Sequence, residues 1–358
     1  NSITDYAFLV AERFLKIPSF GHADSQYVLS QSNNEVVIGN YFREQTSRKK
    51  IFLENVRQFF EKKNVGSENN IKANRGINFL KKCYFLIRTL RSIQKSHLEV
   101  IAELFEQIKL FYHPPSAGFQ EKYNCDLMFT ENNPSVDYLV NSGLKRENIR
   151  VVGNPVYDNA FEKRDQILPK DDKKLNILFI TVNLTSGQGK SDFSKSRRAQ
   201  MIKEVIMSLN QFHQEISLVI KIHPTAENYT EYKQLLEKFE NIHLSQKDDI
   251  IDLISKSDVI ITPVTSTAAI IALIMNKPII IWNYFHIEQD LLLGTDTVLE
   301  CKNVSELGNC VDSVKSFREK NAEKISKFID ENFPYENSSQ RIVSEILDLV
   351  KKHNPHFC

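Results

Sequence analysis

Cysteine and glycine are both scarce in this sequence, and their scarcity narrows the class of protein. The 358 residues include 5 cysteines and 11 glycines. The cysteines are scattered, without a CxxC pair or a Cys/His cluster, so the sequence supports neither a disulfide framework nor a zinc site. Unpaired cysteines of this kind are typical of a reducing compartment, and we expect a cytoplasmic protein.

Long apolar runs and an excess of one charge are missing as well. No hydrophobic run reaches the roughly 20 residues that a helix needs to span a bilayer. Lys and Arg number 46 and Asp and Glu number 45, which gives a formal net charge of +1. A chain with so little net charge has no overall field that attracts polyanions, so we expect no nucleic-acid partner.

Residues 172–300 show a regular alternation of short apolar runs and helical segments. We expect strands at 176–181, 216–222, 241–244, 259–262 and 278–282, separated by helices at 194–213, 228–239, 249–255 and 267–275. Such alternation predicts an α/β domain with a parallel sheet and right-handed crossovers. Ligands bind sheets of this type beyond the carboxyl ends of the strands.

The most informative loop in this domain contains Thr265, Ser266 and Thr267. It follows the expected strand at 259–262 and precedes an apolar helix, a place where free N–H groups and the helix dipole favour a phosphate. We therefore predict an anion site at this loop. Helix capping by Ser266 and Thr267 is the alternative, because it uses the same geometry.

Two further loops of the domain contain residues that could contact a phosphate or a sugar. The run 187–191 is similar to part of a P-loop, but position 184 is leucine where that pattern requires glycine. We expect a polar loop near the phosphates, with Gly187 and Lys190, instead of an ATP cradle. Glu288 and Asp290 follow the expected strand at 278–282, from where a carboxylate can contact a sugar or act as acid or base. The alternative is that Glu288 and Asp290 belong to a solvated loop without such a role. For the protein as a whole, we expect no essential metal.

Residues 1–150 are less regular. Helices are expected at 6–15, 51–63 and 77–112, and short strands at 35–38, 125–130 and 149–152. The helical stretch 77–112 has an apolar stripe flanked by basic residues. This pattern predicts a helix packed on its own domain with a solvated basic face, and peripheral contact with an anionic membrane is the alternative.

A polar, charged segment at 162–174 is the expected hinge between two domains. We place an acceptor-side domain at 1–160 and a nucleotide-donor-binding domain at 161–340. The remaining segment, 341–358, contains a helix that we expect to pack back on the first domain.

Several segments together resemble GT-B-fold enzymes that handle nucleotide-activated sugars or polyols. These segments are 125–130, 143–158, the His-Pro motif at 221–224, and the strand and helix at 258–282. Members of the group include UDP-N-acetylglucosamine 2-epimerases, capsule and lipopolysaccharide glycosyltransferases, and CDP-glycerol glycerophosphotransferases. The resemblance implies an α/β protein of two Rossmann-like domains, with parallel sheets that face each other across a cleft. Its N-terminal domain is expected to be divergent or helix-rich.

The resemblance also implies roles for individual residues. His223 would act on the leaving nucleotide, as a hydrogen-bond donor or as an imidazolium, and an ordinary loop histidine is the alternative. His113 would act on the acceptor side. The donor phosphates would be held by Thr265, Ser266, Thr267 and Lys221.

Gly153 and Asn154 would line the cleft and contact substrate, again by resemblance. One position departs from the pattern of many relatives, which have a Glu that binds the ribose hydroxyls. This chain has Ile271 there. An isoleucine cannot accept those hydrogen bonds, so its presence implies an altered donor site or lost catalysis.

From these features we expect a glycosyltransferase. It would transfer a sugar from a UDP-, CDP- or CMP-linked donor to a surface polysaccharide or glycolipid, in the cytoplasm and without a separate cofactor. The inner face of the membrane is the alternative location. A UDP-sugar 2-epimerase and a CDP-glycerol-type phosphotransferase are the enzymatic alternatives. A non-catalytic nucleotide-sugar-binding protein is the alternative that Ile271 favours.

Overall fold

The computed structural model describes most of the chain and divides it into two compact units. The described residues are 3–22, 28–30, 36–38, 81–112, 125–141, 143–164, 174–182, 195–211, 215–224, 227–239, 242–286 and 290–354. One unit comprises Asn1–Val28, Asn40–Val152 and Gln340–Cys358, and the other comprises Leu29–Gly39 and Gly153–Ser339. The expected helix at 51–63 and four expected site residues lie outside the described ranges: His113, Gly187, Lys190 and Glu288.

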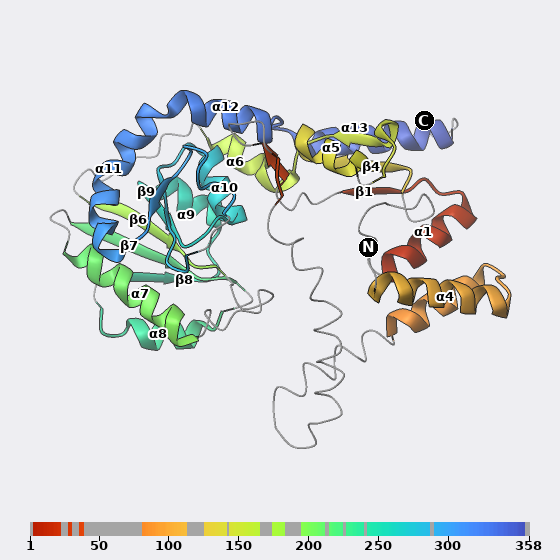
Figure 1. Ribbon diagram of the computed structural model, residues 1–358, viewed down its shortest axis with the longest axis horizontal. Helices are drawn as coiled ribbons and strands as arrows, with labels where there is room; N and C mark the ends of the chain where they lie inside the picture. Colours follow the sequence, from red (N-terminus) through yellow and green to blue (C-terminus); the bar gives the residue numbers. More distant parts are fainter. Residues whose placement is uncertain are drawn as a thin grey trace, which may run out of the picture. The chain divides into compact units, whose positions relative to one another are not determined.

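The second unit is built on a sheet of six parallel strands in the order β11-β10-β9-β6-β7-β8 (Figure 1). The strands are β6 (Leu175–Ile180), β7 (Ile216–Lys221), β8 (Ile242–Ser245), β9 (Val259–Thr262), β10 (Ile279–Trp282) and β11 (Leu299–Cys301). All residues of β9 and β10 are buried, as expected for central strands of a parallel sheet that is covered on both faces.

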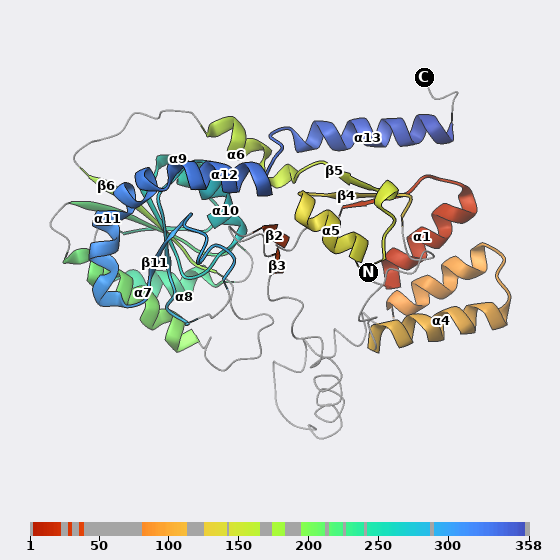
Figure 2. The ribbon, with the colours of Figure 1, turned by 45° about the horizontal axis from the view of Figure 1, so that its top comes forward.

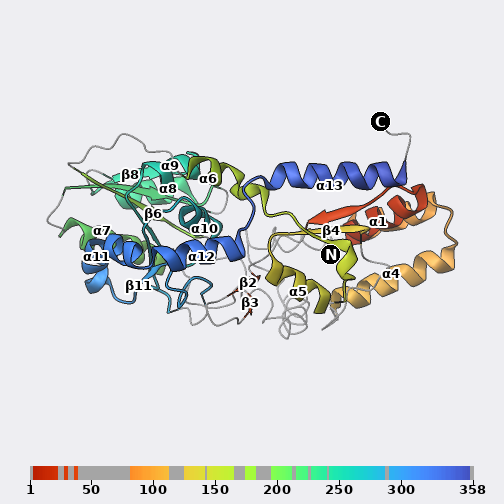
Figure 3. The same cartoon turned by 90° about the horizontal axis from the view of Figure 1, so that it is seen from above.

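Helices cover both faces of this sheet. The helices of the unit are α6 (Asp158–Lys163), α7 (Lys195–Asn210), α8 (Tyr229–Leu236), α9 (Ile250–Lys256), α10 (Thr267–Ile274), α11 (Leu307–Lys320) and α12 (Ala322–Asn332). Buried side chains of α7, α8 and α11 form one apolar cluster with alternate residues of the central strands, including Ile177 and Phe179 of β6. Figure 3 shows α7 and α9 on opposite sides of the sheet. A fully buried Ile or Phe contributes about 1.5–3 kcal/mol relative to an exposed one, so this cluster is a main source of stability.

The first unit contains a parallel sheet of three strands, in the order β1-β4-β5. These strands are β1 (Phe20–His22), β4 (Leu127–Thr130) and β5 (Ile149–Val151). The adjoining helices are α5 (Asn133–Asn141) and α13 (Ser338–His353). Met128 and Val151 pack with α5, whereas Leu127, Phe129 and Val152 pack with the apolar side of α13. Because successive side chains of a strand point to opposite faces, the two helices cover opposite faces of the sheet (Figure 2).

A helical hairpin and a short N-terminal helix belong to the same unit. Residues 81–92 are helical and pack against α4 (His97–Tyr112) around Leu86, Leu90 and Val100. Val10 of α1 (Ile3–Leu15) joins this cluster. The stretch 77–112, expected to be mostly helical, thus contains two helices in its described part, and Gln94 adopts a positive φ of 64° between them. A small separate sheet pairs β2 (Val28–Ser30) with β3 (Val36–Ile38).

The division between the units falls at Val152–Gly153, inside the range expected for the first domain. Of the segment 162–174, expected to be a hinge, residues 165–173 lie outside the described ranges, so the hinge stays a prediction. Within the described ranges, no helix combines the length and the hydropathy that a membrane span requires.

Candidate functional site

Parallel strand register brings several polar loops to one edge of the six-stranded sheet. Ile180 of β6 pairs with Lys221 of β7, and Phe179 pairs with Ile261 of β9. The loops that follow these three strands therefore emerge at the same carboxyl edge. Because β6 lies between β9 and β7 and neighbouring strands are about 4.8 Å apart, the tips of β9 and β7 are about 10 Å apart.

The loop between β9 and α10 is held by a carboxylate from the loop after β10. Asp290 Oδ2 accepts a hydrogen bond of 2.6 Å from the Thr265 backbone N–H, and its Oδ1 accepts the Thr265 hydroxyl. Oδ1 also accepts a bond of 3.0 Å from the Leu292 backbone N–H. Both donors of Thr265 are thus occupied within the protein. The phosphate contact expected of Thr265 and the substrate contact expected of Asp290 stay predictions.

Ser266 caps α10 at the same loop. Its Oγ accepts a bond of 3.3 Å from the Ala269 backbone N–H, the usual N-cap geometry. A serine oxygen that accepts a capping bond keeps its own proton, so the Ser266 hydroxyl can still donate to an anion. Thr267, the first residue of α10, is exposed. Capping and anion binding are therefore compatible at this helix start.

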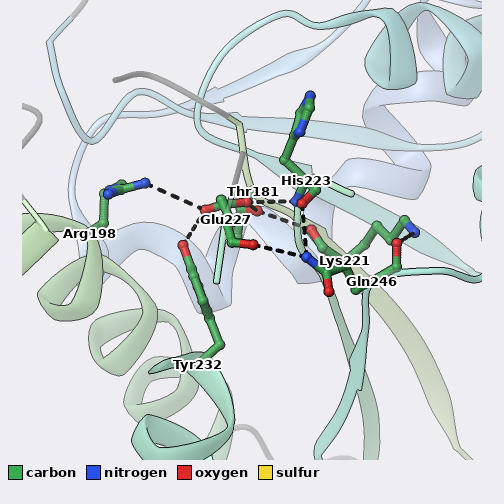
Figure 4. Close-up of polar contacts among 7 residues, drawn as sticks. All are labelled: Thr181, Arg198, Lys221, His223, Glu227, Tyr232 and Gln246. Atoms are coloured by element: carbon green, nitrogen blue, oxygen red, sulfur yellow. Dashed lines mark hydrogen bonds and ion pairs between the residues drawn. The ribbon is translucent and has the colours of Figure 1, made fainter. Parts of the chain in front are cut away.

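A buried carboxylate organises the loop between β7 and α8. The side chain of Glu227 is fully buried, and its Oε2 accepts a bond of 2.6 Å from the His223 backbone N–H. The same oxygen accepts the Thr181 hydroxyl at the end of β6, and Oε1 accepts the Tyr232 hydroxyl from α8. Arg198 of α7 lies 3.8 Å from Oε1 (Figure 4). One carboxylate thus connects four segments of the second unit at the carboxyl edge.

Lys221 ends β7 but points to a neighbouring loop. Its Nζ donates to the carbonyl oxygens of Gln246 and Asp248, at 2.7 and 2.8 Å. Burial lowers the pKa of the Lys221 ammonium below its usual value. The ammonium is thus engaged by the backbone after β8, and the phosphate contact expected of Lys221 stays a prediction.

Gly153 and Asn154 have local structural partners. Gly153 is buried with φ +86°, and a Cβ placed on it would lie 2.3 Å from Ser338 Oγ. Asn154 Oδ1 accepts a bond of 3.1 Å from the Val156 backbone N–H and so caps a 3-10 turn, Pro155–Tyr157. These local contacts are sufficient to explain the glycine at 153 and the asparagine at 154. The substrate contacts expected of the two residues stay predictions.

Ile271 is only 3% exposed and lies within α10, where Ala269 to Ile274 are all buried. It therefore belongs to the apolar packing of the second unit. Among the described residues, no group of three or more His, Cys, Asp or Glu side chains has an arrangement that could hold a metal ion.

Comparison with protein families identifies the group to which this arrangement belongs. The sequence profile of the UDP-N-acetylglucosamine 2-epimerase family matches residues 123–347. The chain belongs to this family. The match extends from just before β4 into α13 and includes every loop of the carboxyl edge described above.

A search of solved structures found similarity to three proteins, among others. The wall teichoic acid polymerase TagF is 16% identical with a TM-score of 0.44, over 65% of this chain and 60% of that chain. MnaA of S. aureus, in a structure with UDP, is 14% identical with a TM-score of 0.45, over 93% and 96%. A UDP-N-acetylglucosamine 2-epimerase is 18% identical with a TM-score of 0.42, over 74% and 77%. The chain therefore spans about 60% of the length of the TagF chain. A comparison with curated protein sequences gave no match.

Membership of the epimerase family confirms the resemblance to nucleotide-sugar enzymes that the sequence segments indicated. The parallel sheets of the two units agree with the expected pair of Rossmann-like domains. Sequence reasoning missed Glu227, Thr181 and Tyr232. The available signal for Glu227 was its position four residues after His223 and one residue before Asn228, the N-cap of α8.

Proposed function

We propose that this chain interconverts the two C2 epimers of a UDP-N-acetylhexosamine. The observation that carries the proposal is the match of the 2-epimerase family over residues 123–347, because it includes the whole carboxyl edge of the six-stranded sheet. The sequence alone favoured glycosyl transfer and kept epimerisation as an alternative. The family match supports the alternative better than it supports transfer.

The geometry of the carboxyl edge is compatible with such a substrate. The Ser266 hydroxyl and the start of α10 provide donors for a diphosphate, as helix N-termini commonly do. His223 lies beyond the end of β7, two strands from that loop. A spacing of about 10 Å between the two strand tips suits an elongated nucleotide sugar better than a single inorganic phosphate.

The chemistry of epimerisation makes the proposal testable. The two epimers contain the same atoms, so the reaction needs no second substrate. Inversion at C2 breaks the C2–H bond and forms it again on the opposite face, with a base that removes the proton and an acid that returns it. Hydrogen from the solvent can therefore enter at C2 during turnover. Glycosyl transfer leaves this bond intact.

The decisive experiment is incubation with UDP-N-acetylglucosamine in deuterated water, followed by proton NMR. We expect the manno epimer to form and the C2 proton signal to disappear without release of UDP. UDP release that requires an added glycan or lipid acceptor would support glycosyl transfer instead. Binding of UDP in a calorimeter with no conversion would support the non-catalytic alternative, which we inferred from Ile271 at the position of a ribose-binding Glu.

A matched pair of variants tests the position of the diphosphate. Ser266→Ala removes both the cap of α10 and a hydroxyl donor, so UDP should bind more weakly. Asn228→Ala removes the cap of α8, because Asn228 Oδ1 accepts hydrogen bonds from the Thr230 and Glu231 backbone N–H groups. Both variants should lose about 1 kcal/mol of stability. Equal UDP affinity in the two variants would contradict this diphosphate position.

A further inference from the structure

The structure assigns to Glu227 the role of positioning His223. We propose that the Glu227 carboxylate fixes the backbone of His223 at the end of β7. The part that concerns catalysis rests on the proposed function, since it takes His223 to act on the nucleotide sugar. The part that concerns geometry stands on the contacts of Glu227 alone.

Glu227 and His223 are in direct contact. The His223 N–H donates to Glu227 Oε2 at 2.6 Å, a short distance that is typical of a charge-assisted hydrogen bond. Thr181, at the end of the adjacent strand, donates its hydroxyl to the same oxygen. Glu227 therefore joins the end of β6 to the residue that follows β7.

A second residue binds the carbonyl group of His223, which belongs to the following peptide unit. Gln246 Nε2 donates to the carbonyl oxygen of Glu227 at 2.9 Å and to that of His223 at 3.4 Å. Lys221 Nζ in turn donates to the carbonyl of Gln246. The backbone of His223 is thus bound through both its N–H and its C=O groups. Figure 4 shows that the His223 ring points away from the carboxylate, so Glu227 acts through the backbone.

The surroundings of Glu227 require a carboxylate. Three hydrogen-bond donors, the His223 N–H and two hydroxyls, contact it, and the Arg198 guanidinium forms an ion pair with it at 3.8 Å. The N–H and the guanidinium can only donate, whereas the hydroxyls can also accept. A glutamine offers one acceptor oxygen, which can serve the His223 N–H or Arg198 but not both. Arg198 is only 11% exposed, so loss of its partner leaves a poorly solvated cation.

Selective labelling tests the geometry without any enzyme assay. In protein labelled with ¹⁵N-histidine, the chain's 9 histidines give a small set of backbone amide signals. His223→Gln identifies the relevant signal. We expect the His223 amide proton far downfield, and upfield of that position in Glu227→Gln. Tyr232→Phe, which removes a donor to the other oxygen, should not move it upfield. An unchanged shift in Glu227→Gln would overturn the proposal.

Glu227→Asp keeps the charge beside Arg198 but shortens the reach to His223. It provides a second variant if Glu227→Gln does not fold, as judged from thermal unfolding. Its His223 amide should resonate upfield of the wild-type position. A wild-type shift in Glu227→Asp would overturn the proposal in the same way.

A double-mutant cycle on kcat tests the effect on catalysis. Loss of a group that orients a catalytic residue commonly costs on the order of 10–100-fold, so Glu227→Gln should lower kcat by that factor with KM little changed. Combined with His223→Ala, it should cause no further loss, because both changes remove the same contribution. Losses that multiply would overturn the proposal. If the wild-type chain converts no UDP-sugar, the proposed function fails by itself and the amide shift still decides the positioning role.

Discussion

Asp290 and Thr265 are joined by two hydrogen bonds, although the sequence separates them by 25 residues. The carboxylate accepts both donors of the threonine and so ties the loop after β10 to the turn that begins α10. The anion site that we propose at this turn therefore depends on a carboxylate for its shape. Asp290 supports the loop, whereas the positive ends of backbone dipoles and the Ser266 hydroxyl are directed to the ligand.

This relationship predicts that Asp290→Asn weakens UDP binding. Replacement of one oxygen by an NH2 group places a donor against the donors of Thr265 and Leu292, and a buried donor without an acceptor costs about 1–3 kcal/mol. We expect about tenfold weaker UDP binding, which corresponds to about 1.4 kcal/mol, in isothermal titration calorimetry. Asp296→Asn is the matched control. Asp296 lies in the same loop as Asp290 but is exposed, and it pairs with Lys324 of α12. Equal affinities in the two variants would refute the dependence.

Gly153 and Gly294 allow the effect of backbone conformation to be separated from that of packing. Both have positive φ, +86° and +80°, but an added Cβ has a neighbour at 2.3 Å only at Gly153, with nothing within 4 Å at Gly294. Gly294→Ala should therefore cost about 1–2 kcal/mol from φ alone. Gly153→Ala should cost a further 1–3 kcal/mol, roughly, from overpacking. Urea unfolding measures both values.

The neighbour of the added Cβ is Ser338 Oγ, which provides a control for that comparison. In a Ser338→Ala background, Gly153→Ala should cost less than it does in the wild type. Similar losses for the two glycine variants in the wild-type background would show that the close approach has no energetic effect.

Asp158 is predicted to stabilise the start of α13. Its two carboxylate oxygens accept bonds of 2.9 Å from the Ser338 N–H and 2.8 Å from the Ser339 N–H. These N–H groups belong to the first turn of the helix, where no intrahelical acceptor exists. Asp158→Ala should lower the free energy of unfolding by about 1–2 kcal/mol, as loss of an N-cap does.

Asp158→Asn keeps one acceptor and should lose less stability than Asp158→Ala. Asp330→Ala, at an exposed position of α12, is the surface control and should change stability by less than about 0.5 kcal/mol. If Asp158→Ala behaves like Asp330→Ala in chemical denaturation, the carboxylate does not stabilise α13.

Glu99 is predicted to titrate at an unusually low pH. It forms a capping box at the start of α4, in which the Ser96 N–H donates to Glu99 Oε2 and the Glu99 N–H donates to Ser96 Oγ, at 2.9 and 3.3 Å. The hydrogen bond from Lys95, followed by the bonds from Ser96, lowers the pKa of Glu99 from 4.5 to about 2. The contribution of this carboxylate to stability is therefore present above pH 4.5 and is lost as the pH falls through about 2.

Carboxyl ¹³C NMR of glutamate-labelled protein measures this titration directly. Lys95→Ala and Ser96→Ala should each move the midpoint of Glu99 upward, with the larger shift in Lys95→Ala because its hydrogen bond has the larger effect. A wild-type midpoint near 4.5 would contradict the capping box.

The local sequence pattern was sufficient to predict those helices and strands whose own residues favour one conformation. The strand at 259–262 was predicted with the bounds that β9 has, because a β-branched run followed by a hydroxyl-rich loop leaves few other conformations. The helix at 267–275 was likewise predicted to within one residue of α10. Strand β1 was missed, since three residues that include Gly21 have no strand pattern of their own. They form a strand only by pairing with β4, and Leu127 lies opposite Phe20.

The amino-acid sequence by itself determined the alternation of strands and helices, and hence a parallel sheet with polar loops at its carboxyl edge. It also determined the family, since that match depends on sequence alone. Only the tertiary structure decided which polar groups meet at the edge: Glu227 with Thr181 and Arg198, Asp290 with Thr265, and Lys221 with the backbone after β8. The physical reason for this difference is that sequence periodicity indicates only which face of a helix or strand is buried. The partner of a buried charge is set by strand order and register, which bring distant residues within hydrogen-bonding distance.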